Sequence, residues 1–136
     1  AVYSVRAMGY ARSVDSCRKE QEMNALEELQ GYQADWMKFK ELQPDVIGAF
    51  GQMRNAAVSS GMDLKTLELV AVAVCVARKC EPCMLSHVKV AIEAGVTREE
   101  LTAALNMAVL LCGGPGWAYS AKALKAYDEM TAALAE

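Results

Sequence analysis

The segment that most constrains the fold of this chain is LKTLELVAVAVCVARK, a nearly continuous apolar run that begins at Leu64. Its valines would suit a buried strand, but such strands are usually only about 4–8 residues long. Asp63 stands directly before the run, where the side chain of an N-cap residue accepts a hydrogen bond from the first turn of a helix. The run therefore predicts a helix over residues 64–77 that is apolar on nearly every side.

Helical patterns joined by short connections continue through most of the chain. Pro44 and Pro115 can each open a helix, and Thr97 with Glu100 forms a Ser/Thr-x-x-Glu capping box. The predicted helices cover residues 21–42, 44–59, 64–77, 81–94, 98–112 and 115–134. An alanine-rich composition with few aromatic residues also favours helix over sheet. The predicted fold class is all-α, a bundle of about six helices.

The length of 136 residues suits a single domain with its own hydrophobic core. Residues 1–20 show weak periodicity, so we expect a tail or a loosely packed leader there. Residues 21–136 are expected to form one helical domain. Because so many residues are alanine, the chain has little bulk with which to surround the helix at 64–77. We therefore expect a homo-oligomer, in which a second copy covers part of that helix.

Charge and hydropathy argue against several classes of protein. A net charge of −3 leaves no basic face, so we expect no nucleic-acid partner. The longest apolar run, 69–77, is too short to span a bilayer, and the first twenty residues lack the apolar core of a secretion signal. We expect a cytoplasmic protein that does not enter a membrane. In that reducing compartment, the five cysteines suggest catalysis, metal binding or core packing sooner than a structural disulfide framework.

The sequence CEPCMLSH, residues 80–87, holds two cysteines and the only histidine of the chain. Cys83 and His87 are four residues apart, so they share one face of the predicted helix. Cys80 stands at C-x-x-C spacing from Cys83, and Pro82 suits the first turn of a helix. A helix N-terminus and a neighbouring imidazole can lower the pKa of a thiol from about 8.5 to roughly 3.5–7.5. This spacing indicates a redox site.

Glu68 is the one carboxylate inside the apolar run. A buried carboxylate needs a partner, and His87 is the obvious candidate, because a Glu–His hydrogen bond would also orient the imidazole ring. With Cys83 this gives a nucleophile, a base and an orienting group. Two other interpretations remain open. Two thiolates, one imidazole and one carboxylate could complete a zinc tetrahedron, or the cysteines could simply be buried in the core beside a satisfied histidine.

The pattern Glu68-x11-Cys80-x2-Cys83-x3-His87 resembles the E-x11-C-x2-C-x3-H signature of the AhpD-like alkylhydroperoxidases, which belong to the carboxymuconolactone decarboxylase superfamily. The similarity extends over about residues 44–128 and includes the Gly-Gly-Pro turn before the last predicted helix. It implies an AhpD-like helical bundle that assembles as trimers or as hexamers built from dimers. It also implies an antioxidant enzyme, a peroxidase whose cysteine pair cycles between dithiol and disulfide.

The resemblance further implies a role for each residue of the signature. Cys83 would be the peroxidatic cysteine and Cys80 the resolving one, with Glu68 and His87 as the proton relay. The implied partners are a hydroperoxide substrate and a lipoyl or thioredoxin-like dithiol reductant, with no cofactor. One departure is Pro82, which stands where the best-known AhpD enzymes carry a second histidine; its effect falls more on peroxidase chemistry than on general disulfide reduction.

Two alternatives belong to other functional classes. The decarboxylase branch of the superfamily lacks the cysteine pair, so a carboxymuconolactone decarboxylase-type lyase would act without those thiols. A zinc-stabilised, non-enzymatic module is the other. Among the remaining cysteines we expect Cys75 in the core, Cys112 in the core or at a helix end, and Cys17 as a stray thiol of the leader. The aromatic clusters at 36–39 and 117–119 are expected to pack in the core or in an interface.

Overall fold

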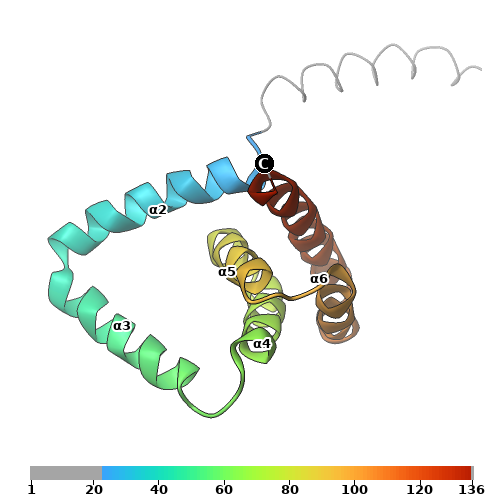
Figure 1. The fold of residues 1–136 in the computed structure, drawn as a ribbon, viewed down its shortest axis with the longest axis horizontal. Coiled ribbons are helices and arrows are strands. Elements are labelled where there is room, and N and C mark those ends of the chain that lie inside the picture. Colours follow the sequence, from blue (N-terminus) through green and yellow to red (C-terminus); the bar gives the residue numbers. More distant parts are fainter. Residues whose placement is uncertain (1–22, 136) are drawn as a thin grey trace, which may run out of the picture.

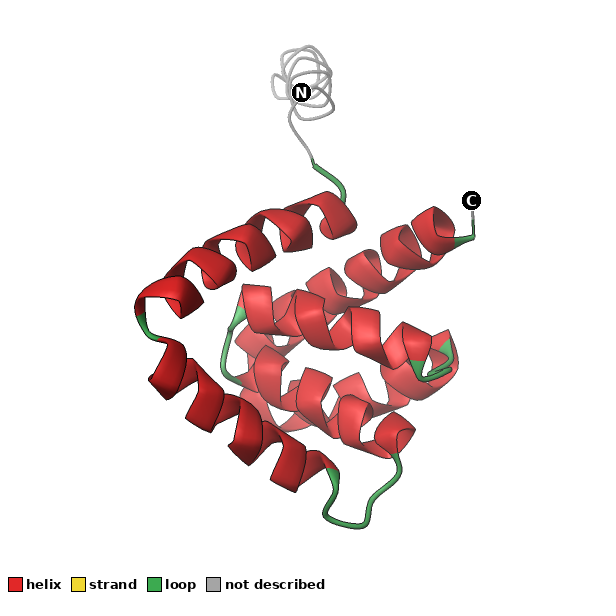
Figure 2. Ribbon diagram, turned by 60° about the vertical axis from the view of Figure 1, so that its left-hand side comes forward, coloured by secondary structure: helices red, strands yellow, loops and turns green. Residues whose placement is uncertain are grey.

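The computed structural model describes residues 23–135, and within this range the chain is helical with no β-strand (Figures 1 and 2). Its helices are α2 (Ala25–Leu42), α3 (Pro44–Val58), α4 (Leu64–Ala77), α5 (Glu81–Glu93) and α6 (Arg98–Leu134). The all-α prediction is confirmed. The predicted leader at 1–20, with Cys17, lies outside the described residues, as does the first part of the helix predicted from residue 21.

Helix α6 contains the break that the sequence predicts between its last two helices. Gly113 has φ 61° and ψ −139°, a backbone conformation outside the helical region that favours glycine. Two helical segments therefore meet there within α6, and Pro115 stands in the first turn of the second. The five helices of the described range correspond to the expected bundle of about six once this break is counted.

By length and composition alone, α6 is the one helix among residues 23–135 that could cross a membrane. Only 22% of its most apolar stretch is buried within the chain. That stretch runs across Gly113, because the segment before the break is too short, and the segment after it carries four charged residues: Lys122, Lys125, Asp128 and Glu129. A single such helix is weak evidence for a membrane span, and the break interrupts its hydrogen-bonded backbone.

Local capping explains why the helix starts can be predicted. The Asp63 carboxylate accepts the N–H of Thr66 at the start of α4, and Thr97 and Glu100 form the predicted capping box at α6. A further capping box at the start of α2, formed by Asn24 and Glu27, escaped the sequence analysis. In each case a side chain satisfies backbone donors that have no partner within the helix.

The hydrophobic core lies between α4, α5, α6 and the first two turns of α2. Figure 1 shows α4 and α5 packed beside each other, with α6 alongside them, and all three helices contact one another. The most completely buried side chains come from all four helices: Leu29, Val72, Val76, Met84, Val88, Leu101, Leu105 and Met130. The site residues of α4 and α5 are therefore held by the best-packed part of the molecule.

The second half of α2 and all of α3 form an arm that leaves this core (Figures 1 and 2). No residue of α3 is buried, and its one substantial contact is with α2. Trp36, Met37 and Phe39 are about half exposed, and Trp117 is 71% exposed. Of the two expected places, the core of this chain is therefore excluded for these side chains and an interface stays a prediction, whereas Tyr119 does pack against the core. A helix that buries nothing gains almost no tertiary stabilisation from its own chain.

Replacing Gly116 by alanine should destabilise the fold, because a Cβ there would overlap the backbone carbonyl of Ala108 across the break in α6. We expect a loss of about 1–3 kcal/mol in the free energy of unfolding, measured by urea denaturation. Gly114→Ala is the matched control, since nothing lies within 4 Å of a Cβ at that position. Equal stability of the two variants would contradict the close approach at Gly116.

Candidate active site

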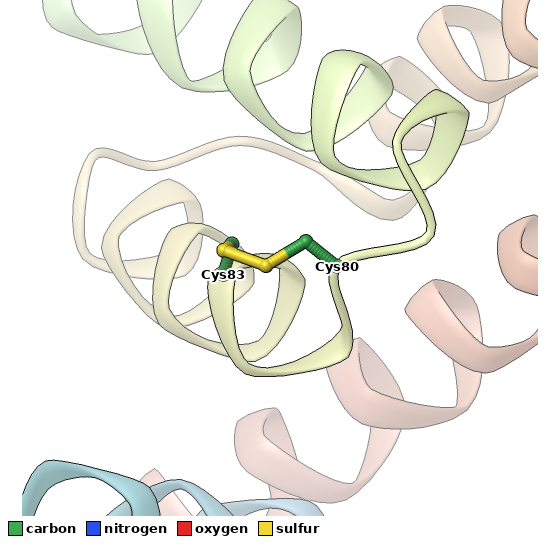
Figure 3. The surroundings of a disulfide bond; sticks show 2 residues. All are labelled: Cys80 and Cys83. Carbon is green, nitrogen blue, oxygen red and sulfur yellow. A yellow bond between two sulfur atoms is a disulfide. The ribbon is translucent and has the colours of Figure 1, made fainter.

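The centre of the site is a disulfide between Cys80 and Cys83, at the start of α5 (Figure 3). Cys80 is the N-cap of the helix and Cys83 lies in its first turn, with 5.3 Å between their Cα atoms. Pro82 occupies that turn as the sequence predicts, where its missing N–H breaks no hydrogen bond. The C-x-x-C spacing thus brings the two sulfurs together at the positive end of a helix dipole.

The turn between α4 and α5 fixes the position of Cys80. The N–H of Lys79 donates to the carbonyl of Val76 (3.0 Å), and the N–H of Cys80 donates to the carbonyl of Cys75 (3.1 Å). This is a Schellman motif whose left-handed residue is Lys79, with φ 56°. Glycine is the usual residue there, and a side chain costs roughly 1–2 kcal/mol. Because no glycine marks this turn, the sequence analysis did not single out Lys79.

A buried acid and the only histidine lie together between α4 and α5. Glu68 Oε2 is 2.7 Å from His87 Nδ1, and Glu68 is 3% exposed whereas the His87 side chain is 34% exposed. The predicted proximity of these two side chains is confirmed. Since a carboxylate only accepts hydrogen bonds, Nδ1–H is the donor, and Nε2 of the neutral ring is left as an acceptor. The pair therefore orients a base.

His87 follows Cys83 by one helical turn on α5, so the base and the second cysteine lie on the same side of that helix. Both cysteines and His87 are half-buried, within reach of solvent. In the dithiol state, the Cys83 thiol would stand near the N-terminal N–H groups of α5, which stabilise a thiolate. This arrangement can carry out thiol–disulfide exchange and can deprotonate a thiol.

The other described cysteines differ from the pair in environment. Cys75 is buried and free, as predicted for a core residue. Burial raises the pKa of the Cys75 thiol, and the negative charge of Glu68 raises it further. Cys112 is free and half-buried at the end of the first segment of α6, next to Gly113. Neither has the helix N-terminus that favours a thiolate at the Cys80–Cys83 pair.

A zinc centre receives no geometric support from the part of the chain that the structure describes. Within residues 23–135, no three His, Cys, Asp or Glu side chains are grouped so that they could hold a metal ion. Cys80 and Cys83, two of the four ligands that such a centre would need, are bonded to each other. The carboxylate and imidazole expected to complete it are bonded to each other as well.

Fold and site together define a small all-α protein with a cysteine pair at a helix N-terminus and a buried Glu–His pair behind it. Residues 44–126 match the carboxymuconolactone decarboxylase family. The chain belongs to this family, which confirms the resemblance that the sequence signature suggests.

Similar proteins point the same way. A solved structure of a carboxymuconolactone decarboxylase family protein from Legionella pneumophila is 34% identical, with a TM-score of 0.74 over 77% of this chain and 95% of that one. An uncharacterized protein from Cupriavidus necator is 36% identical over 68% of this chain and 82% of its own length.

Two further proteins match a smaller share of the chain or share fewer identical residues with it. An uncharacterized protein encoded in the cox locus of Paracoccus denitrificans is 36% identical over 53% of this chain and 65% of its own length. A Burkholderia xenovorans protein assigned as a carboxymuconolactone decarboxylase shares the fold, with a TM-score of 0.65, 24% identity and coverage of 73% and 79% of the two chains.

Alkylation should separate the free core thiol from the reduced pair. In native protein reduced with dithiothreitol, iodoacetamide at pH 7 should modify Cys75 at least about tenfold more slowly than Cys83, because burial limits access and a raised pKa leaves less thiolate. The modification of Cys75 should speed up as the pH rises towards that raised pKa. Mass spectrometry of timed samples gives the rate at each cysteine, and equal rates at pH 7 would contradict the assigned environments.

Proposed function

We propose that this protein is a thiol-dependent peroxidase and disulfide oxidoreductase that reduces hydroperoxides. One observation carries the proposal: a disulfide between Cys80 and Cys83 at the start of α5, one turn before a histidine that is bonded to the buried Glu68. Membership of the carboxymuconolactone decarboxylase family is compatible with this activity, because the family includes AhpD-like members. The four residues of the signature supply a nucleophile, a resolving thiol, a base and an orienting acid.

The oxidative half of the cycle begins with the dithiol. His87 Nε2 accepts the proton of the Cys83 thiol, and Glu68 stabilises the imidazolium that forms. The Cys83 thiolate attacks the distal oxygen of the hydroperoxide, so that the O–O bond breaks and an alkoxide leaves. His87 returns its proton, which yields the alcohol. The sulfenic acid on Cys83 then condenses with the Cys80 thiol to give the disulfide and water.

The reductive half restores the dithiol by exchange. A thiolate of an external dithiol, of the lipoyl or thioredoxin type, attacks one sulfur of the disulfide and forms a mixed disulfide. The second thiol of the donor then attacks its own mixed disulfide and leaves oxidised. Two electrons and two protons pass from the donor to Cys80 and Cys83. A reducing compartment such as the cytoplasm, the setting we propose, would sustain this step.

His87 is the only histidine of the chain, so no second imidazole assists the peroxide step. The best-known AhpD enzymes carry a second histidine in the first turn of this helix, and in this chain Pro82 occupies that position. We therefore propose that disulfide exchange is at least as important an activity as peroxide reduction. A lyase or hydrolase on the same scaffold is the rival activity, and it would not depend on either cysteine.

We further propose that the protein works as a homo-oligomer, a trimer or a hexamer. A groove of about 350 Å³ between α4 and α6 is lined almost entirely by apolar side chains, among them Val70, Val74 and Leu111. These three are about half or more exposed within one chain. The arm presents a second apolar surface, on α3. A second copy would remove both from water.

Substitution of each cysteine should separate their roles. Cys83→Ser is expected to abolish peroxide turnover, because the serine hydroxyl stays protonated near neutral pH and does not attack a peroxide. Cys80→Ser should still react once and leave a sulfenic acid on Cys83, since no thiol is left to condense with it. Turnover is measured with a dithiol donor, and the sulfenic acid is trapped with dimedone and located by mass spectrometry.

Glu68→Gln tests the relay in the same assay. Glutamine retains the shape but cannot stabilise an imidazolium as a carboxylate does, so we expect turnover to fall by about 10²-fold. Cys75→Ser is the control, because that thiol takes no part in the cycle. Full turnover in Cys83→Ser would overturn the peroxidase assignment, and activity that survives the loss of both cysteines would favour the lyase or hydrolase.

The proposed assembly has its own measurement. At micromolar concentration, light scattering should give a mass of three or six chains, because the apolar surfaces of α3 and of the α4–α6 groove would otherwise stay in water. Leu111→Glu should reduce that mass, since a charge inside a packed interface is costly. A wild-type protein with the mass of one chain would rule out the oligomer.

A further inference from the structure

Two cations directly precede the disulfide. Arg78 is the C-cap of α4 and Lys79 forms the turn that leads into Cys80, and both side chains are exposed. Neither makes an ion pair with any side chain that the structure describes. The nearest acid in sequence, Glu81, is already neutralised, because Lys122 Nζ lies 2.8 Å from both of its carboxylate oxygens. Two exposed cations without an ion-pair partner among the described residues therefore stand directly before Cys80, on a chain whose net charge is −3.

Backbone geometry makes Lys79 an unexpected choice for this turn. Its φ of 56° lies in the left-handed region, which glycine adopts without strain and a lysine does not. Gly61 and Gly95 take positive φ in the connections that follow α3 and α5, where the chain does use glycine. The conformation of the turn therefore does not account for a lysine beside Cys80, whereas a need for positive charge at the disulfide would.

We propose that Arg78 and Lys79 form a docking surface for a dithiol protein whose reactive cysteines are flanked by acidic side chains. This inference rests on the proposed function, since it names the class of reductant for the same disulfide. Opposite charges at a contact raise the rate of encounter and hold the partner in register. The attacking thiolate is itself an anion, so the same two cations also favour its approach to sulfur.

The exchange balances without any further reactant. The partner thiolate forms a bond to one sulfur of the Cys80–Cys83 disulfide, and the S–S bond breaks to release the other sulfur as a thiolate. The second partner thiol then displaces the remaining sulfur from the mixed disulfide. The partner ends as a disulfide, and Cys80 and Cys83 end as thiols that hold the two electrons and the two protons.

Three synthetic dithiol peptides provide the test. They share the core Cys-Gly-Gly-Cys and are flanked on both sides by two glutamates, two glutamines or two lysines. Reduction of the oxidised full-length protein by each peptide is quenched at intervals by alkylation and quantified by mass spectrometry. Each rate is divided by the rate of the same peptide with 2-hydroxyethyl disulfide, a neutral compound, which corrects for differences in thiolate fraction.

At low ionic strength we expect the glutamate peptide to react about tenfold faster than the lysine peptide after that correction. The preference should shrink to less than about threefold in the double variant Arg78→Gln/Lys79→Gln, and also in wild type at 0.5 M salt. Lys40→Gln/Arg54→Gln is the matched control, because it removes the same charge from the arm and should keep the full preference. A wild-type protein without preference, or a preference that the Arg78/Lys79 variant retains, would overturn the proposal.

Lys79→Gly separates docking from a purely structural role. Relief of the left-handed strain should raise the melting temperature, while loss of one cation should weaken the preference for the glutamate peptide. If the two cations served only to complement the negative end of the α4 dipole, stability would change and the peptide preference would not. Exchange with a clear charge preference but without peroxide turnover would refute the peroxidase assignment and leave this docking surface in place.

Discussion

A carboxylate buried in the most apolar helix is the constraint on which the site depends. Glu68 is 3% exposed, so its charge would cost several kcal/mol if it were left without a partner. Its bonded partner is His87 of the neighbouring helix, at 2.7 Å. That bond ties α5 to α4 one helical turn beyond Cys83, and the buried side chains between the same two helices hold the first turn of α5 in place. The orientation of the base thus follows from this bond, and the position of Cys80 follows from the turn through Lys79.

The same carboxylate separates the cysteines into two kinds. Cys75 shares α4 with Glu68, and both burial and the negative charge raise the pKa of its thiol, so less of it is present as the reactive thiolate at neutral pH. Cys83 stands instead on α5, near helix N–H groups and one turn from His87, where a thiolate is favoured. Cys75, Cys80 and Cys83 thus lie within nine residues of one another, yet their surroundings give the buried Cys75 and the Cys80–Cys83 pair different tendencies to form a thiolate.

Much of the fold could be predicted because its signals are local. Asp63 and the Thr97–Glu100 capping box mark helix starts, and the contact of Glu68 with His87 follows from the cost of burying a charge. The exposure of the arm could not be predicted, because apolar residues at helical spacing look alike whether they face their own core or another chain. The left-handed conformation of Lys79 could not be predicted either, because a glycine usually marks such a position in a sequence and this turn has none.

The proposed assembly and the proposed redox chemistry use different sides of α4. At about 100° per residue, Val70, Ala73 and Ala77 of the apolar groove lie across the helix from Glu68. A second copy seated in that groove would therefore contact the surface opposite the Glu68–His87 pair. The charged edge formed by Arg78 and Lys79 stands at the end of α4, where the chain turns towards the disulfide. Burial of the apolar surface is thus compatible with access of an acidic dithiol to the sulfurs.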